Sequence, residues 1–172
     1  MKLNVGAGKL CYDNYINVDI KYFSGIDIIC NIDGVLLPFK DCSFDEILVD
    51  HTLNHIDNMM NLMEEIHRVG IAGAKVLISE PYYRYEGAFQ DPTHKHFFAE
   101  RTFEIFCENY EYNYYTKARF EVVSVKLSIT HKTKTKSLAK KIMKIPIPFR
   151  RILNNFLWNL YSEIHYELKV LK

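Results

Sequence analysis

The sequence lacks three features that would place it in a membrane or outside the cell. No apolar run is long enough for a membrane-spanning helix, and the start has no basic segment, apolar stretch or small-residue cleavage site. The four cysteines, Cys11, Cys30, Cys42 and Cys107, show no Cys-x-x-Cys spacing, so we expect reduced thiols and no disulfide framework. These absences predict a cytoplasmic protein.

The composition is that of a folded globular protein. Apolar residues make up 48% and aromatic residues 14% of the 172 residues, which excludes a disordered or low-complexity chain. A chain of this length can bury roughly 70% of its unfolded surface around one core. We therefore expect residues 1–172 to form a single domain.

The net charge of +1 hides two parts of opposite sign. Residues 1–130 carry 12 Lys and Arg against 19 Asp and Glu, whereas residues 131–172 carry 10 against 2. A basic block of this kind is typical of contact with anionic partners, meaning acidic lipid headgroups, nucleic acid or a phosphorylated substrate.

Short apolar runs alternate with helix-like segments. Several of the runs are continuous, which is typical of strands covered on both faces. They lie at 2–5, 15–19, 26–30, 44–49, 74–79 and 120–129. Helical spacing predicts helices over 57–69, with Asp57 as the N-cap, and over 99–110. The alternation predicts an α/β fold with a mostly parallel sheet.

The C-terminal part follows a different pattern. Lysine-rich residues lead into Ile145-Pro146-Ile147-Pro148, after which helical spacing predicts a helix over 149–164. The alternation of residues 166–171 predicts an antiparallel last strand that returns to the sheet. Residues 131–163 are therefore expected to form a basic amphipathic insertion.

A glycine loop follows the first predicted strand. Gly6-Ala7-Gly8 stands there, and Asp19 ends the second strand. Glycines let the backbone approach a ligand closely, and an acid at the next strand end can accept hydrogen bonds from ribose hydroxyls. The two glycines alone fit an ordinary turn equally well. Asp19, and Asp33 after the third strand, favour a nucleoside site at the carboxyl edge of the sheet.

A dinucleotide site fits this loop poorly. The third glycine of Gly-x-Gly-x-x-Gly would fall at Cys11, and too few residues follow for a full crossover helix. The helix N-terminus that binds a pyrophosphate is therefore missing or rudimentary.

Six motifs follow one another over about residues 2–106. They are LNVGAG at 3–8, YINVDI at 15–20, LPFKDCSFDEI at 37–47, HTLNHI at 51–56, EEIHRV at 64–69 and DPTHKHFF at 91–98. Each is weak alone, but in this order they resemble the small bacterial and archaeal S-adenosylmethionine-dependent methyltransferases of the Rossmann-like, type 11-like class.

The resemblance implies S-adenosylmethionine as the cofactor and assigns residues by position. The glycine loop would pass under the methionyl part, Asp19 would bind the ribose, and residues 31–33 would flank the adenine. Asp50 and His51 would lie near the sulfonium and the acceptor. The implied cofactor-binding residues are Gly6, Ala7, Gly8, Asp19, Ile20, Asn31, Ile32, Asp33, Asp50 and His51.

The sequence departs from the family pattern at several places. The family commonly has cysteine where Ala7 stands, glutamate where Asn54 stands, and a Pro-Gly-Gly turn at 71–74. It also often has an N-terminal helix that closes the cofactor site. The departures leave open a second function, a catalytically degenerate domain that binds the cofactor as a partner or regulatory subunit.

The catalytic candidates are His51, His94 and Asp91. A neutral imidazole is the natural general base for methyl transfer to oxygen. In the structural interpretation, His51 packs against the cofactor edge, while Asp91 and His94 fix the loop after the fifth strand. The sequence leaves both interpretations open.

The histidines also allow a metal-dependent hydrolase. His51 and His55 lie four residues apart, and Asp91, His94 and His96 could complete a zinc site. Asn54 is no general base, so the His-Glu-x-x-His arrangement of metalloproteases is not met. We expect no metal.

Three roles compete for residues 131–163. They could form an interfacial helix on an anionic membrane, an acceptor-binding lid, or a cap packed on the sheet. The aromatic residues group on one helix face instead of alternating with basic ones, so nucleic acid is not the expected partner. The acceptor is expected to be an oxygen or nitrogen of a small molecule, a sugar or a lipid-linked compound.

Overall fold

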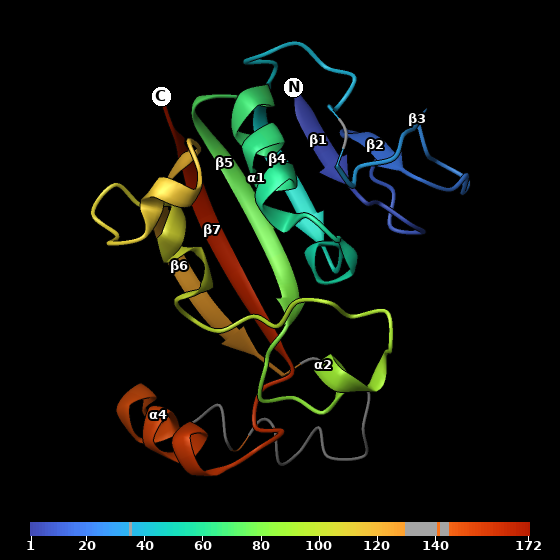
Figure 1. Ribbon diagram of the computed structural model, residues 1–172. Coiled ribbons are helices and arrows are strands. Elements are labelled where there is room, and N and C mark those ends of the chain that lie inside the picture. Colours follow the sequence, from blue (N-terminus) through green and yellow to red (C-terminus); the bar gives the residue numbers. More distant parts are fainter. Residues whose placement is uncertain (35, 130–140, 142–144) are drawn as a thin grey trace.

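The computed structural model describes residues 1–34, 36–129, 141 and 145–172. They contain one seven-stranded sheet in the order β3-β2-β1-β4-β5-β7-β6 (Figure 1). The strands are β1 Lys2–Val5, β2 Ile16–Asp19, β3 Ile28–Ile29, β4 Phe44–Asp50, β5 Gly70–Pro81, β6 Arg119–Ser128 and β7 Glu163–Leu171. The α-helices are α1 Met59–Val69, α2 Gly87–Gln90 and α4 Ile147–Phe156, and 3-10 turns lie at Leu53–His55, Thr102–Phe106 and Asn113–Tyr115.

The first five strands run parallel, and β7 runs antiparallel between β5 and β6. The mostly parallel sheet and its antiparallel last strand are thus confirmed. The chain moves outward from β1 to β2 and β3, and then returns to place β4 on the other side of β1. This reversal of strand order makes a crevice at the carboxyl ends of β1, β2 and β4, where α/β folds bind ligands.

No helix joins β1 to β2 or β2 to β3, whose linking residues 6–15 and 20–27 are all described. Residues 6–15 link β1 to β2 through turns closed by Leu10 N to Ala7 O at 2.8 Å and Tyr15 N to Tyr12 O at 3.0 Å. The side chain of Asn4 holds this link against the strands by donating to Leu10 O at 2.8 Å and to Asn17 Oδ1 at 3.0 Å. The expectation that the helix N-terminus after the glycine loop is missing or rudimentary is confirmed for these residues.

Only one face of the sheet carries helical cover among the described residues. The helix α1 and the turn Thr102–Phe106 lie on the same side (Figure 1). There, Phe103 packs against Tyr166 with the ring centroids 4.6 Å apart, and Phe106 packs against Phe120 at 5.7 Å.

The opposite face is polar and differs from the expectation of a sheet covered on both faces. Along β7, polar residues alternate with the buried residues Ile164, Tyr166, Leu168 and Val170. On this face, lysines pair with glutamates on neighbouring strands. The pairs are Lys2 with Glu46 at 2.9 Å, Lys75 with Glu167 at 3.5 Å and Lys169 with Glu121 at 3.3 Å.

The expected helix over 99–110 is wrong in type. Its core contacts come from Phe103 and Phe106, both buried and three residues apart. That spacing suits the 3-10 turn Thr102–Phe106, and Cys107 then turns into an extended conformation.

The expected helix over 149–164 is wrong in its extent. The helix α4 ends at Phe156, and β7 begins at Glu163, three residues earlier than expected. Leu160 and Ile164 are buried, as expected for the apolar face of a helix. In the structure, however, Leu160 lies just before β7 and Ile164 is the second residue of that strand. Lysine-rich residues 132–140 and 142–144 lie outside the described residues.

The N-cap of α1 is Asn58, not the expected Asp57. The Oδ1 atom of Asn58 accepts from the Asn61 N–H at 3.0 Å. The Asp57 carboxylate pairs instead with Lys95 at 2.6 Å.

All four cysteines are free thiols, as expected. Among the described helices, none has the length and apolar character needed to cross a membrane.

Candidate functional site

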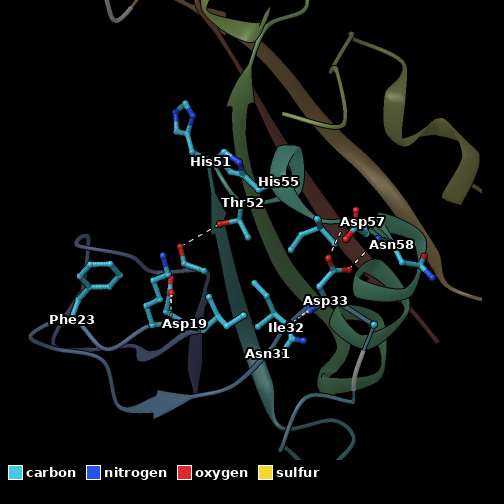
Figure 2. A pocket seen from close by; sticks show the side chains of 15 residues that line it. Asp19, Phe23, Asn31, Ile32, Asp33, His51, Thr52, His55, Asp57 and Asn58 are labelled. Carbon is cyan, nitrogen blue, oxygen red and sulfur yellow. Dashed lines mark hydrogen bonds between the residues drawn. The ribbon is translucent and has the colours of Figure 1, made fainter. Parts of the chain in front are cut away.

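A cavity of about 900 Å³ lies at the carboxyl ends of β1, β2 and β4 (Figure 2). This volume is within the range of small-molecule sites. Its walls come from the glycine loop, the ends of β2 and β3, and the segment between β4 and α1. The lining residues are Gly6, Asp19, Ile20, Lys21, Phe23, Asn31, Ile32, Asp33, Gly34, His51, Thr52, His55, Ile56, Asp57 and Asn58.

Gly6 forms the floor where β1 ends. Its φ of +70° lies in the left-handed region, and a Cβ at this position would come within 2.3 Å of Thr52 Oγ1 and 2.9 Å of Thr52 Cβ. The backbone N–H groups of Gly6 and Ala7 both donate to Val18 O, at 2.9 and 3.0 Å. Only glycine meets both the conformation and the close approach.

Thr52 ties the ends of β1 and β4 together. Its hydroxyl oxygen lies 3.2 Å from Val5 O and Gly6 O and 3.0 Å from Asp50 O. Its backbone N–H donates to the Glu80 carboxyl at 3.0 Å.

The carboxyl group of Glu80 is buried beneath this junction. Its Oε1 accepts from the N–H groups of Thr52 and Leu53, at 3.0 and 2.7 Å, and its side chain has no solvent exposure. Burial raises the pKa of Glu80 to about 8 against these hydrogen bonds, so the group is largely neutral near pH 7.

Asp19 ends β2 and fixes the glycine loop. Its Oδ2 accepts from the Gly8 N–H at 2.8 Å, and its Oδ1 accepts from the Lys21 N–H at 2.9 Å. A carboxylate has about four acceptor positions, so each oxygen can accept a further hydrogen bond on the cavity side.

Asp33 connects the end of β3 to the start of α1. Its carboxylate accepts from the backbone N–H groups of Asp57 and Asn58, at 2.8 and 3.1 Å. Partial burial acts to raise the pKa of Asp33, but these two donors and Lys95 lower it overall. Asn31 Oδ1 accepts from the Asp33 N–H at 3.0 Å, which closes the turn.

His51 follows β4 in a left-handed conformation with φ of +47°. Its Nε2 lies 3.6 Å from Glu163 Oε1 and 4.0 Å from Asp50 Oδ1. The contact with Glu163 raises the pKa of His51 against the effect of burial. Burial also raises the pKa of Asp50.

Glu163 lies between two histidines, because its other oxygen is 3.6 Å from His165 Nε2. The His165 ring in turn contacts the hydroxyls of Ser79 and Ser128, at 2.9 and 2.7 Å. Sequence reasoning missed Glu163, because it assigned this position to a helix that does not reach it.

His55, Asp91 and His94 meet beside the cavity. The rings of His55 and His94 are 4.9 Å apart at an interplanar angle of 69°. Thr93 links His55 to Asp91, since its hydroxyl donates to Asp91 Oδ1 at 2.7 Å and lies 2.9 Å from His55 Nδ1.

The structure brings seven of the ten expected cofactor-binding residues to one cavity. Ala7 is buried in the middle of the loop, Gly8 contacts Asp19, and Asp50 lies beside His51; none of these three lines the cavity. Asp91 and His94 also lie outside the lining and reach it through His55.

Lys21, Phe23, Thr52, Ile56 and Asn58 line the cavity without having been expected there. Their proximity to Asp19, His51 or Asp57 in sequence was the available signal. Which of them face the cavity depends on the path of the loops, which periodicity does not predict.

The N-terminal part of the chain matches a known domain family. Residues 5–78 match the family model described as "Methyltransferase domain". No curated protein matches the chain.

Solved structures share the fold over nearly the whole chain. A SAM-dependent methyltransferase from Archaeoglobus fulgidus is 16% identical with a TM-score of 0.66, covering 98% of this chain and 85% of its own. An S-adenosylmethionine-dependent methyltransferase from Mesorhizobium loti is 11% identical with a TM-score of 0.61, covering 98% and 89%.

The [4+2]-cyclase SpnF is also similar, with 15% identity and a TM-score of 0.62 over 99% of this chain and 74% of its own. At these identities the likeness concerns the fold. The described function of SpnF illustrates that one fold can carry more than one chemistry.

The close approach of Gly6 to Thr52 can be tested against Gly8, which shares the left-handed conformation but would have no atom within 4 Å of an added Cβ. We expect Gly8→Ala to lower the free energy of unfolding by about 1 kcal/mol through backbone strain. Gly6→Ala should cost roughly 1–3 kcal/mol more, because the new methyl group overpacks against Thr52. Urea unfolding measures both, and equal losses would contradict the packing argument.

Proposed function

We propose that this chain, which carries a Rossmann-like S-adenosylmethionine-dependent methyltransferase domain, methylates an oxygen or nitrogen of a small-molecule, sugar or lipid-linked acceptor. The observation that supports this best is the cavity at the strand ends. There the bare backbone of Gly6, the carboxylate of Asp19 and the imidazole of His51 line one space of about 900 Å³.

The residues present fit the cofactor of this family, S-adenosylmethionine. The absence of a side chain at Gly6 leaves room for the methionyl part, and Asp19 has acceptor positions left for the ribose hydroxyls. Ile20 and Ile32 offer apolar contacts to the adenine. When bound, the cofactor supplies a methyl group that its sulfonium activates.

His51 is the proposed general base. It lines the cavity, and its Nε2 faces Glu163. In its neutral form the imidazole can accept the acceptor's proton, and the nearby carboxylate stabilises the imidazolium that results. Positioning the acceptor beside the activated methyl supplies most of the remaining rate.

The role of Asp19 predicts a preference for the ribose form of the ligand. We expect the wild type to bind S-adenosylhomocysteine roughly tenfold more tightly than its 2′-deoxy counterpart, since a hydrogen bond to a charged group contributes about 1.5–3 kcal/mol. In Asp19→Asn this ratio should shrink, because one carboxylate oxygen is lost. Titration calorimetry measures both ligands.

The matched control for that comparison is Asp13→Asn, which changes an exposed acid in the same β1–β2 loop. It should leave the ratio unchanged. Because a ratio is compared, a uniform loss of affinity from a loosened loop does not imitate the effect. An unchanged ratio in Asp19→Asn would contradict the assigned role.

The His51–Glu163 contact predicts the pH dependence of methyl transfer. Since the pKa of His51 is raised above 6.5, its neutral form appears only as the pH rises through that raised value. Activity should therefore rise with pH above the ordinary histidine range. Glu163→Gln should move the rise to lower pH and reduce the plateau, whereas the surface variant Glu121→Gln should do neither.

That prediction is measured in two ways. The first follows the His51 ring protons by NMR, which gives the midpoint without any acceptor. The second follows transfer of labelled methyl to hydroxyl- and amine-bearing acceptors against pH. A His51 midpoint that Glu163→Gln leaves unchanged would contradict the pairing, and full transfer by His51→Ala would contradict the base.

We also propose that α4 contacts anionic membranes. Asn154 anchors this helix by donating to the buried Tyr82 hydroxyl at 2.8 Å. On the outside, Phe149, Phe156 and Trp158 are 61%, 80% and 60% exposed. The sequence before the helix is rich in lysine, and basic residues beside exposed aromatic ones are typical of helices that lie at a headgroup boundary.

Vesicle flotation tests this membrane contact. We expect recovery with vesicles of phosphatidylcholine and phosphatidylserine, and little with phosphatidylcholine alone, because lysines supply part of the attraction. The double variant Phe156→Ser, Trp158→Ser should lose recovery, while Tyr22→Ser, which alters an aromatic residue that is 74% exposed, should keep it. Recovery that is independent of anionic lipid would contradict the proposal.

A further inference from the structure

Three metal-ligating side chains converge at one wall of the cavity. His55 comes from the turn after β4, and Asp91 and His94 come from the loop after α2. One ligand atom from each residue lies within 4.8 Å of the other two. His55 also lines the cavity, so the cluster faces the space where the acceptor is proposed to bind.

Hydrogen bonds fix the orientation of His94. Its Nδ1 lies 2.8 Å from Ala88 O, and a carbonyl can only accept, so Nδ1 carries the proton. The Nε2 atom is therefore left with a lone pair. It faces Asp91 Oδ2 at 4.0 Å, which is too long for a hydrogen bond.

The same reasoning fixes His55. The Thr93 hydroxyl uses its proton on Asp91 Oδ1 at 2.7 Å. The same hydroxyl oxygen lies 2.9 Å from His55 Nδ1. Because its proton is already used, it must accept a hydrogen bond from that ring nitrogen. His55 is thus left with its Nε2 lone pair, and one acid oxygen is held by Thr93 while the other faces His94.

This pattern is that of ligands oriented by a second layer of hydrogen bonds, as metal-binding histidines usually are. Ligand atoms around a zinc ion lie roughly 3.3 Å apart, given bonds of about 2.0–2.1 Å. The observed separations reach up to 4.8 Å, so the side chains must move toward one another to enclose an ion.

We propose that His55, Asp91 and His94 bind one divalent first-row transition metal ion, with zinc as the reference ion. Two imidazoles and one carboxylate leave coordination positions open. We further propose that an acceptor hydroxyl or carboxylate oxygen occupies an open position; this second part rests on the proposed methyl transfer, whereas metal binding does not.

The proposal differs from the sequence-based expectation of no metal. It also leaves out two of the five residues considered as zinc ligands in the sequence, His51 and His96. His96 Nε2 lies 2.8 Å from Ile56 O, and His51 faces Glu163. Neither ring contributes to the three-residue cluster.

The test uses untagged full-length protein that has been treated with chelator and dialysed. Titration calorimetry with zinc sulfate should show one ion per chain. Cobalt(II) should give visible d–d bands that zinc abolishes by competition. Each of His55→Ala, Asp91→Asn and His94→Ala should weaken zinc binding by at least tenfold, while His96→Gln, a change in the same loop, should not.

Thr93→Val provides a test that keeps all three ligands. It should weaken zinc binding by roughly 10–100-fold, as the loss of a second-layer partner does, and it should shift the cobalt bands. If a ligand variant fails to fold, Thr93→Val still tests whether the three residues bind zinc. The proposal would be overturned if the wild type failed to bind one zinc ion per chain in the titration. It would also be overturned if zinc binding were unchanged in Thr93→Val and in the folded ligand variants.

Binding of S-adenosylhomocysteine in the same preparations separates this proposal from the proposed function. Retained cofactor binding without zinc binding would overturn the metal site alone. Zinc binding without binding of S-adenosylhomocysteine would support the metal site and contradict the proposed function.

Discussion

The contact of Thr52 with the end of β1 is the interaction on which the rest of the site depends. Its hydroxyl reaches the carbonyls of Val5 and Gly6, and its side chain occupies the space that any residue other than glycine would need at position 6. Beneath it, the buried Glu80 carboxyl holds the N–H groups of Thr52 and Leu53. Because burial keeps Glu80 largely neutral near pH 7, the junction does not enclose an unpaired charge.

This junction sets the positions of the residues on either side of it. His51 precedes Thr52 and is turned by a left-handed backbone toward β7, while His55 follows it in a short 3-10 turn. The glycine loop meets Asp19 on the other side. One packed contact between β1 and β4 therefore places the cofactor end, the proposed base and the proposed metal ligand around the same cavity.

The described part of the chain builds this edge with few helices. Its uncovered sheet face is stabilised by cross-strand lysine–glutamate pairs, such as Lys75 with Glu167. Exposed pairs of this kind contribute only about 0–1 kcal/mol each to the free energy of unfolding. Their main effect is to make this face of the sheet polar, so that it can be exposed to water. The main stabilisation comes from the covered face, where Phe103, Phe106 and Tyr166 are buried.

The features that depend on local sequence pattern were predicted correctly. The strand-like runs, the glycine loop and Asp19 could be placed because strand ends in a parallel sheet meet at one edge. Glu163 could not be placed, because Leu160 and Ile164 fit helical spacing although the structure puts Ile164 in a strand. The open sheet face was also missed, because the continuous apolar runs were taken to indicate cover on both faces, although the alternation of residues 166–171 is itself typical of a strand with one exposed face.

The roles proposed for Asp19 in binding the ribose and for His51 as the base both require that the cavity holds the cofactor. The most direct test is titration calorimetry of the intact wild-type protein with S-adenosylmethionine and with S-adenosylhomocysteine. The account predicts that each binds at one site per chain and that the two compete. Absence of binding by both, in protein shown to be folded, would contradict it.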